Sequence, residues 1–185
     1  MNPALTPANQ LTLLRMLLIP VFAILLIYGH VGASLAVFSF AALTDLFDGL
    51  IARRTGQKTT LGAWLDPMAD KLLLVTAFVV LTLPLEHLTN RLPLWLTLLI
   101  ISRDIGIVAT VAIVNLAVGR RTFTPSLLGK AATATFLVTG VVTLYANLLG
   151  RHVFVVDVAI WASFAITLLS GLHYIVHAAR LVANN

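Results

Sequence analysis

Four aspartates within one short stretch are the residues of this chain best placed to do chemistry. Asp45 and Asp48 are three residues apart, and Asp66 and Asp70 are four apart, so each pair lies on one face of a helix. Four carboxylates that converge at low dielectric cannot all stay ionised without a positive partner. A divalent metal would supply that charge, and an all-oxygen ligand set suits Mg²⁺ or Mn²⁺.

The composition places these acids inside a membrane protein. Of the 185 residues, 59% are hydrophobic and 10% are charged, whereas a soluble domain carries about 25% charged residues. One all-α integral membrane domain over residues 1–185 is therefore expected. The net charge of +5 is scattered between apolar runs, which favours lipid phosphate over nucleic acid as the partner. The absence of cysteine excludes disulfides and thiol chemistry.

The elements that must position the aspartates are six predicted membrane helices in one bundle. The hydropathy and the turn residues predict helices over roughly 11–28, 32–54, 61–83 and 93–119, from a cap at Thr124 or Ser126 to about residue 150, and over 155–182. Pro84 is expected to stop the third helix and Pro93 to start the fourth. Arg15 lies inside the first helix, where an arginine must pair, snorkel or face a polar cavity.

The basic residues in the loops predict the orientation of the bundle. The loops after the second and fourth helices carry most of the loop lysines and arginines, whereas the opposite loops carry only Arg91 and Arg151. Because cytoplasmic loops are enriched in Lys and Arg, the motif loop and both termini should be cytoplasmic. We therefore expect a polar cleft that faces the cytoplasm, in a multi-pass protein of the bacterial inner (plasma) membrane.

The stretch 45–70 resembles the signature of the CDP-alcohol phosphotransferases, membrane enzymes that build phospholipids from CDP-activated lipids. The pattern of that family is D-x2-D-G-x2-A-R-x8-G-x3-D-x3-D, and every fixed position is filled here. The matching residues are Asp45, Asp48, Gly49, Ala52, Arg53, Gly62, Asp66 and Asp70. The resemblance implies that an acceptor hydroxyl attacks a CDP-lipid and releases CMP, with two cations bridging the diphosphate.

The resemblance also implies a role for each aspartate. Asp45, Asp48 and Asp66 would be metal ligands. Asp70 would bind the second metal and act as the general base that takes the proton of the acceptor hydroxyl. The plainer alternative is four structural acids, which is disfavoured because acids inside a membrane are costly and are usually functional.

Small and basic residues of the same stretch are expected to bind the CDP group of the donor. These residues are Gly49, Ala52, Arg53, Lys58, Thr59 and Gly62. Arginine can donate paired hydrogen bonds to phosphate, and glycine lets a nucleotide approach the backbone closely. The plainer alternatives are helix packing for the small residues, snorkelling for Arg53 and a solvated loop for Lys58 and Thr59.

Charged residues outside the motif are expected to bind the acceptor. Arg103 and Asp104 lie inside the fourth helix, where charge is expensive, and the resemblance suggests that Arg103 holds an acceptor phosphate which Asp104 orients. Lys130 resembles the second acceptor-phosphate residue of the family, and Arg15 belongs to an N-x2-T-x2-R pattern at the cytoplasmic mouth. The alternatives are a buried Arg103–Asp104 ion pair and a snorkelling helix-end lysine at position 130.

Within the family, the residues 62–71 and the Arg103–Asp104 pair resemble the branch that makes anionic lipids from CDP-diacylglycerol. Its acceptors are glycerol 3-phosphate, which gives phosphatidylglycerol phosphate, and phosphatidylglycerol, which gives cardiolipin. Glycerol 3-phosphate is the leading prediction. The enzymes that use it usually carry a further basic residue after the Arg–acid pair, and residues 109–114 contain none, so cardiolipin synthesis stays open. The resemblance suggests a homodimer, and a cation transporter is the non-enzyme alternative.

Overall fold

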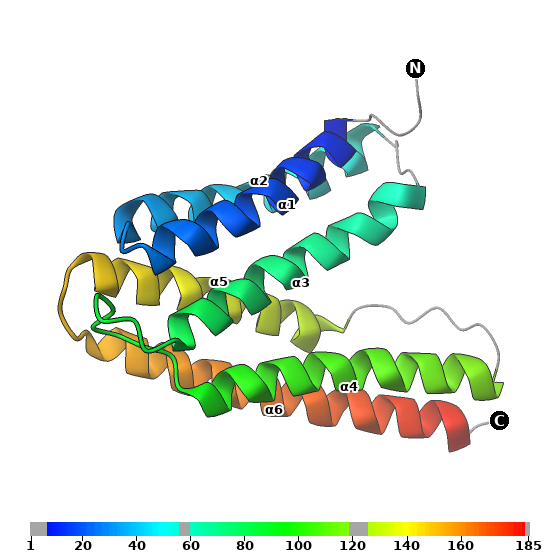
Figure 1. Cartoon of the computed structure of the whole chain (residues 1–185). Coiled ribbons are helices and arrows are strands. Elements are labelled where there is room, and N and C mark those ends of the chain that lie inside the picture. Colours follow the sequence, from blue (N-terminus) through cyan, green and yellow to red (C-terminus); the bar gives the residue numbers. More distant parts are fainter. Residues whose placement is uncertain (1–6, 56–59, 119–125, 184–185) are drawn as a thin grey trace. The chain divides into compact units, whose positions relative to one another are not determined.

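Within the part of the chain that the structure describes, helices are the only regular secondary structure, as predicted, and short turns and loops connect them. The computed structural model describes residues 7–55, 60–118 and 126–183, and it describes side chains over residues 10–44, 68–111 and 126–176. The helices, shown in Figure 1, are α1 Pro7–Ile27, α2 Val31–Thr55, α3 Thr60–Thr82, α4 Leu94–Val118, α5 Leu127–Leu148 and α6 Phe154–Ala183. Their bounds lie within a few residues of the predicted ones.

Local sequence signals explain where α5 begins and ends. Ser126 caps the helix, because its Oγ accepts a hydrogen bond of 3.0 Å from the backbone nitrogen of Gly129. Thr124, the other predicted cap, lies outside the described residues. After the helix, Gly150 has a φ of +63°, a left-handed conformation that glycine adopts without strain.

Two prolines mark the connection between α3 and α4. Helix α3 ends at Thr82, shortly before Pro84. Helix α4 begins at Leu94, directly after Pro93, and the carbonyl oxygen of Pro93 accepts a hydrogen bond of 3.0 Å from the backbone nitrogen of Leu96. Both prolines therefore act as the sequence predicted.

The chain forms two compact units. Unit 1 comprises Met1–Arg91 and Gly140–His152, and unit 2 comprises Leu92–Thr139 and Val153–Asn185. Helices α1, α2 and α3 therefore belong to unit 1, whereas α4 and α6 belong to unit 2. Helix α5 contributes its first part to unit 2 and its second part to unit 1.

Unit 1 is built on the packing of α1 against α2 and α3. The rings of Phe22 and Phe38 are fully buried, and their centroids lie 5.4 Å apart. A Cβ at Gly140 would come within 2.9 Å of the Phe38 ring, so α5 approaches this core closely only with glycine there. Asn90 and Asn147 bind each other: Asn147 Oδ1 accepts from the Asn90 nitrogen at 2.7 Å, and Asn147 Nδ2 donates to the Asn90 carbonyl at 2.8 Å.

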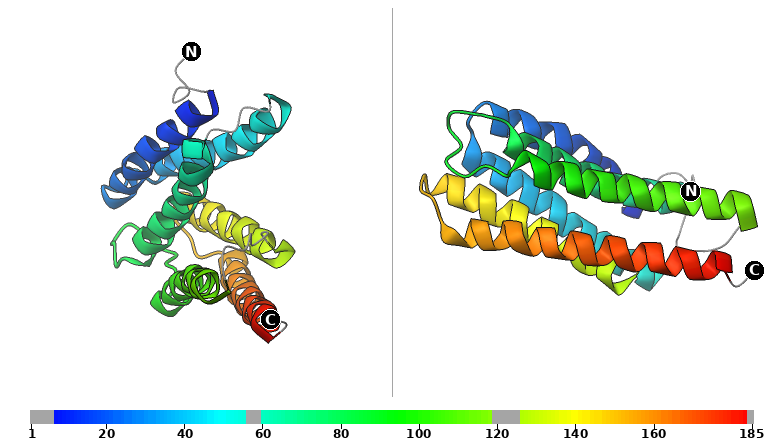
Figure 2. Two further views of the ribbon diagram at one scale, coloured as in Figure 1. Left: turned by 90° about the vertical axis from the view of Figure 1, so that its right-hand side faces the viewer. Right: turned by 90° about the horizontal axis from the view of Figure 1, so that it is seen from below.

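Unit 2 is built on α4 and α6, which run side by side in both views of Figure 2. The Trp95 ring centroid lies 6.0 Å from that of Trp161 and 5.5 Å from that of Phe164. Thr139 of α5 and Ser163 of α6 share a buried hydrogen bond of 2.8 Å. Buried hydroxyl pairs of this kind join helices in an apolar surrounding.

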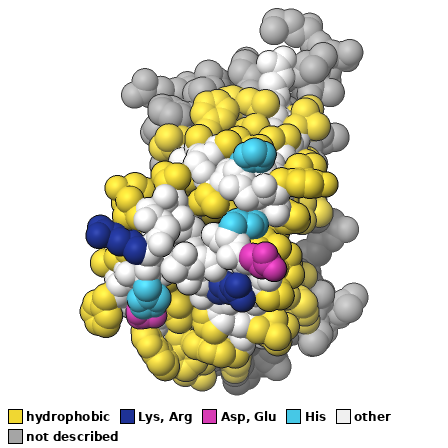
Figure 3. Space-filling view, turned by 60° about the vertical axis from the view of Figure 1, so that its left-hand side comes forward, with side chains coloured by type: hydrophobic (Ala, Val, Ile, Leu, Met, Phe, Trp, Pro, Cys, Tyr) yellow, Lys and Arg dark blue, Asp and Glu magenta, His cyan; other side chains and the backbone are white. Residues whose placement is uncertain are grey.

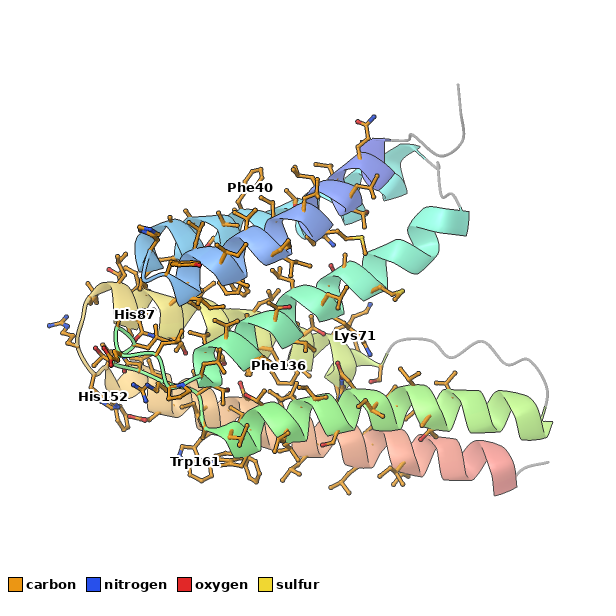
Figure 4. All side chains as sticks on the ribbon, in the orientation of Figure 1. Phe40, Lys71, His87, Phe136, His152 and Trp161 are labelled. Carbon is orange, nitrogen blue, oxygen red and sulfur yellow. The ribbon has the colours of Figure 1, made fainter. Side chains whose placement is uncertain are left out.

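The surface of the described helices is that of a membrane protein. Among the described residues, four segments are long and apolar enough to cross a membrane: Gln10–Ile27, Leu94–Val111, Leu127–Leu148 and Phe154–Val176. In Figure 3 hydrophobic side chains are exposed around a central region of polar and charged groups, and Phe40 projects outward in Figure 4. Exposed apolar surface of this extent fits a membrane protein. The six-span bundle with a cytoplasmic cleft stays a prediction.

Candidate functional site

Most of the predicted metal and donor residues lie where the structure describes no side chain. Lys58 and Thr59 lie outside the described residues altogether. The backbone alone is described for Asp45, Asp48, Gly49, Ala52, Arg53, Gly62 and Asp66. That backbone places two of the four aspartates in α2 and the other two in α3, and these two helices contact each other within unit 1. The predicted arrangement of two acid-bearing helices is confirmed to this extent.

Asp70 is the member of the aspartate quartet whose side chain the structure describes. It lies in the first half of α3 with a side chain that is 31% exposed, and its Oδ1 accepts a hydrogen bond from Nη1 of Arg15 in α1. The Arg15 side chain is 1% exposed, and Thr12, one turn earlier, is fully buried as well. Lys71, the residue after Asp70, is exposed (Figure 4). An arginine inside a membrane helix must pair, snorkel or face a polar cavity, and Arg15 forms an ion pair.

The Arg15–Asp70 ion pair was not predicted from the sequence. It joins residues that are 55 positions apart, so no spacing within one helix reveals it. The signal in the sequence was one basic residue inside α1 together with two acidic residues, Asp66 and Asp70, inside α3, since opposite charges in apolar helices tend to meet. The pair places Arg15 beside the expected base, in addition to its predicted role at the acceptor site.

Arg103 and Asp104 form an ion pair in α4, with side chains that are 12% and 20% exposed. Arg103 Nη1 donates to Asp104 Oδ1 at 2.7 Å, and Arg103 Nε donates to Ser170 Oγ of α6 at 3.1 Å. Nη2 donates to no residue that the structure describes, and it carries two N–H groups. The guanidinium is thus held on two sides and keeps hydrogen-bonding capacity on the third.

The first turn of α5 lies beside this third side. A Cβ built on Gly129 would lie 3.8 Å from Arg103 Nη2. Lys130 follows directly and is exposed. The beginning of a helix carries partial positive charge, which favours an anion. The structure therefore brings Arg103, whose Nη1 is bound by Asp104, to the beginning of the helix that carries another predicted acceptor residue, Lys130, while Arg15 belongs to unit 1.

Residues 5–169 match the profile of the CDP-alcohol phosphatidyltransferase family. The chain belongs to this family. The predicted enzyme class, a phosphatidyltransferase of phospholipid synthesis, is thereby confirmed, and the membership favours an enzyme over a cation transporter.

Three relatives carry the names of the two enzyme activities that were predicted as alternatives. A Mycobacterium tuberculosis (strain CDC 1551 / Oshkosh) protein named "Probable phosphatidylglycerophosphate synthase" is 37% identical over 94% of this chain and 81% of its own length. A Pseudomonas fluorescens "CDP-diacylglycerol--glycerol-3-phosphate 3-phosphatidyltransferase" is 49% identical over 55% of this chain and 52% of its own length. A Homo sapiens "Cardiolipin synthase (CMP-forming)" is 42% identical over 60% of this chain and 35% of its own length.

CDP-alcohol phosphatidyltransferases generally depend on divalent metal, and Asp70 suits that requirement. Its carboxylate is a hard oxygen donor, the type that Mg²⁺ and Mn²⁺ prefer. Among the described side chains no group of three or more His, Asp or Glu residues gathers to hold a metal. The three other expected ligands, Asp45, Asp48 and Asp66, lie outside those side chains, so the metal site stays a prediction.

Proposed function

We propose that this chain transfers a phosphatidyl group from CDP-diacylglycerol to the hydroxyl of glycerol 3-phosphate and releases CMP. The observation that carries the choice of acceptor is the position of Arg103 Nη2 beside the first turn of α5. The similarity to the protein named as a phosphatidylglycerophosphate synthase extends over 94% of the chain, against 60% for the human cardiolipin synthase, which supports the same choice.

The surroundings of Arg103 suit a phosphate monoester. Such a group carries close to two negative charges and three acceptor oxygens. Arg103 offers a guanidinium edge, the beginning of α5 offers partial positive charge, and Lys130 offers an exposed ammonium group on the same turn. Asp104 and Ser170 hold the guanidinium in place, so the donors are oriented before the acceptor binds.

In the proposed reaction Asp70 takes the proton of the acceptor hydroxyl. The oxygen attacks the phosphorus that carries diacylglycerol, and the bond from that phosphorus to the CMP oxygen breaks, so that CMP leaves with the electron pair. When bound by the aspartates at 45, 48, 66 and 70, two Mg²⁺ or Mn²⁺ ions would neutralise the diphosphate and stabilise the leaving CMP. The donor's CDP would be held by Arg53 and the small residues of the motif.

The proposal includes the setting of the enzyme. Six membrane spans in one domain over residues 1–185 would carry a cleft open to the cytoplasm, where the acceptor and CMP are soluble. The basic loops after α2 and α4 support this orientation in a bacterial inner membrane. A homodimer is part of the proposal on the strength of family resemblance alone.

One assay separates the acceptors. Purified protein receives CDP-diacylglycerol and Mn²⁺ with either glycerol 3-phosphate or phosphatidylglycerol, and the lipid product is identified by mass spectrometry. We expect metal-dependent CMP release and phosphatidylglycerol phosphate with the first acceptor. Cardiolipin formed only with the second would replace the proposal by its alternative, which the lack of a basic residue in 109–114 favours. Ion flux without CMP release would point to the transporter.

A further inference from the structure

A pocket of about 370 Å³ lies beside Arg103, between α4 and α6 of unit 2. This volume falls in the range of about 300–1,000 Å³ that ligand pockets occupy. On α4 the lining extends from Leu99 to Thr110, which corresponds to about 16 Å along a helix. The pocket is therefore long rather than compact, a form that suits an extended apolar chain better than a headgroup alone.

Two glycines help to shape this pocket. Gly106 of α4 lines it, and a Cβ built there would meet no atom within 4 Å. Gly171 of α6 lines the facing wall, and a Cβ there would lie 3.8 Å from Arg103 Cγ. Larger side chains at these positions would extend into the pocket. The space thus depends on missing side chains at Gly106 and Gly171, which lie on two different helices.

The rest of the lining is mostly apolar and includes exposed side chains. Leu172 and Ile175 line the pocket and are each 62% exposed. Arg103 is the charged residue of the wall, and its Nη2 makes no hydrogen bond to a described residue. An occupant that matches this lining has a long apolar part and an anionic group that reaches the guanidinium.

We propose that the α4–α6 pocket binds an anionic phospholipid of the membrane, with one acyl chain between the helices and its phosphate on Arg103. The proposal shares Arg103 with the proposed acceptor site. A lipid in the pocket would therefore compete with glycerol 3-phosphate for the same guanidinium. The inference rests on the proposed function, because phosphatidylglycerol used as the acceptor would itself place its phosphate on Arg103. With glycerol 3-phosphate as the acceptor, the bound lipid is a separate ligand, and its occupancy can be measured without turnover.

The binding test compares wild-type protein with Gly106→Trp by native mass spectrometry after incubation with phosphatidylglycerol. The added indole would fill the pocket, so we expect the variant to retain several-fold less phosphatidylglycerol. Ile105→Trp is the matched control, because it adds the same side chain one position earlier, at a residue that is 63% exposed and does not line the pocket. Equal retention by the wild type and a folded Gly106→Trp variant would overturn the proposal.

A second measurement guards against misfolding of the tryptophan variant. The chain has no cysteine, so Gly106→Cys introduces a unique thiol into the pocket. We expect phosphatidylglycerol to slow its reaction with a maleimide several-fold more than phosphatidylcholine does, and Arg103→Gln to remove that difference. Equal protection by both lipids would overturn the assignment of the phosphate to Arg103. Intact protection together with cardiolipin formation in the acceptor assay would identify the bound lipid as the acceptor and overturn the proposal of a separate site, whereas intact protection without any turnover would reject the proposed function and keep the lipid site.

Discussion

Among the described side chains, an arginine–aspartate pair lies inside the apolar helices of each compact unit, and these two pairs are built differently. Arg15 and Asp70 join α1 to α3 across 55 positions of the chain, and the arginine is 1% exposed. Arg103 and Asp104 are neighbours on α4, with exposures of 12% and 20%. The first pair links two helices, whereas the second mainly sets the direction of one side chain.

The comparison of the two pairs shows when a buried charged group can still bind a ligand. The carboxylate of Asp70 gives the fully buried Arg15 guanidinium the partner that a charge in an apolar core requires. Arg103 is held through Nη1 and Nε, which leaves Nη2 for an anion. Asp70 therefore has two roles, because it is both the partner of Arg15 in the ion pair and the proposed general base. At Arg103 the two roles fall on different nitrogens.

The largest expected effect comes from Asp70→Asn, which keeps the size of the side chain and removes the proton acceptor. We expect CMP release to fall by about 10²–10⁴-fold, the usual contribution of general-base catalysis. CMP binding, measured by calorimetry, should be retained. Normal turnover in this variant would refute the role of Asp70 as the base.

Arg15→Met tests whether the first pair supports the fold. Removing one partner of a buried pair costs about 3–5 kcal/mol, and because Asp70 is 31% exposed we expect a loss near the lower end, about 3 kcal/mol. The measurement is the free energy of unfolding in detergent.

The double variant Arg15→Met/Asp70→Asn is the control for that experiment. It leaves no unpaired charge, so it should be more stable than Arg15→Met alone. If the two variants were equally stable, the ion pair would contribute little, and the contrast between the two pairs would be lost.

Arg103→Ala should have a smaller effect than Asp70→Asn and Arg15→Met, and the effect should be limited to binding of the acceptor. A hydrogen bond to a charged group contributes about 1.5–3 kcal/mol, so the KM for glycerol 3-phosphate should rise by about tenfold or more, and the KM for CDP-diacylglycerol much less. Ser170→Ala removes only the Nε contact and serves as the milder control. An equal rise in both KM values would mark the pair as structural.

The fold was predictable to the extent that local signals determine it. Ser126 caps α5 through its own side chain, and Pro84 and Pro93 act through their own rings, so no distant residue is needed to place these helix ends. The hydrophobic runs between such signals are long, which makes the helices easy to recognise.

The sequence allowed the types of residue in the site to be predicted, but not the contacts between them. The aspartate spacing predicts two acid-bearing helices, yet the Arg15–Asp70 pair depends on how α1 packs against α3. In the sequence Gly106 cannot be distinguished from other small residues of membrane helices. It lines a pocket only because α6 packs beside α4. Contacts between helices arise from tertiary packing, which periodicity along one helix does not encode.

The reciprocal amide contact between Asn90 and Asn147 has a consequence for chemical ageing of the protein. Asn147 Nδ2 donates to the Asn90 carbonyl at 2.8 Å. Hydrolytic loss of ammonia from Asn147 would replace that donor by a carboxylate oxygen, and two acceptors would then face each other in a buried place. Deamidation of this one side chain would therefore weaken the contact between the segment before α4 and the end of α5. The chemical change adds only about one dalton to the mass of the chain.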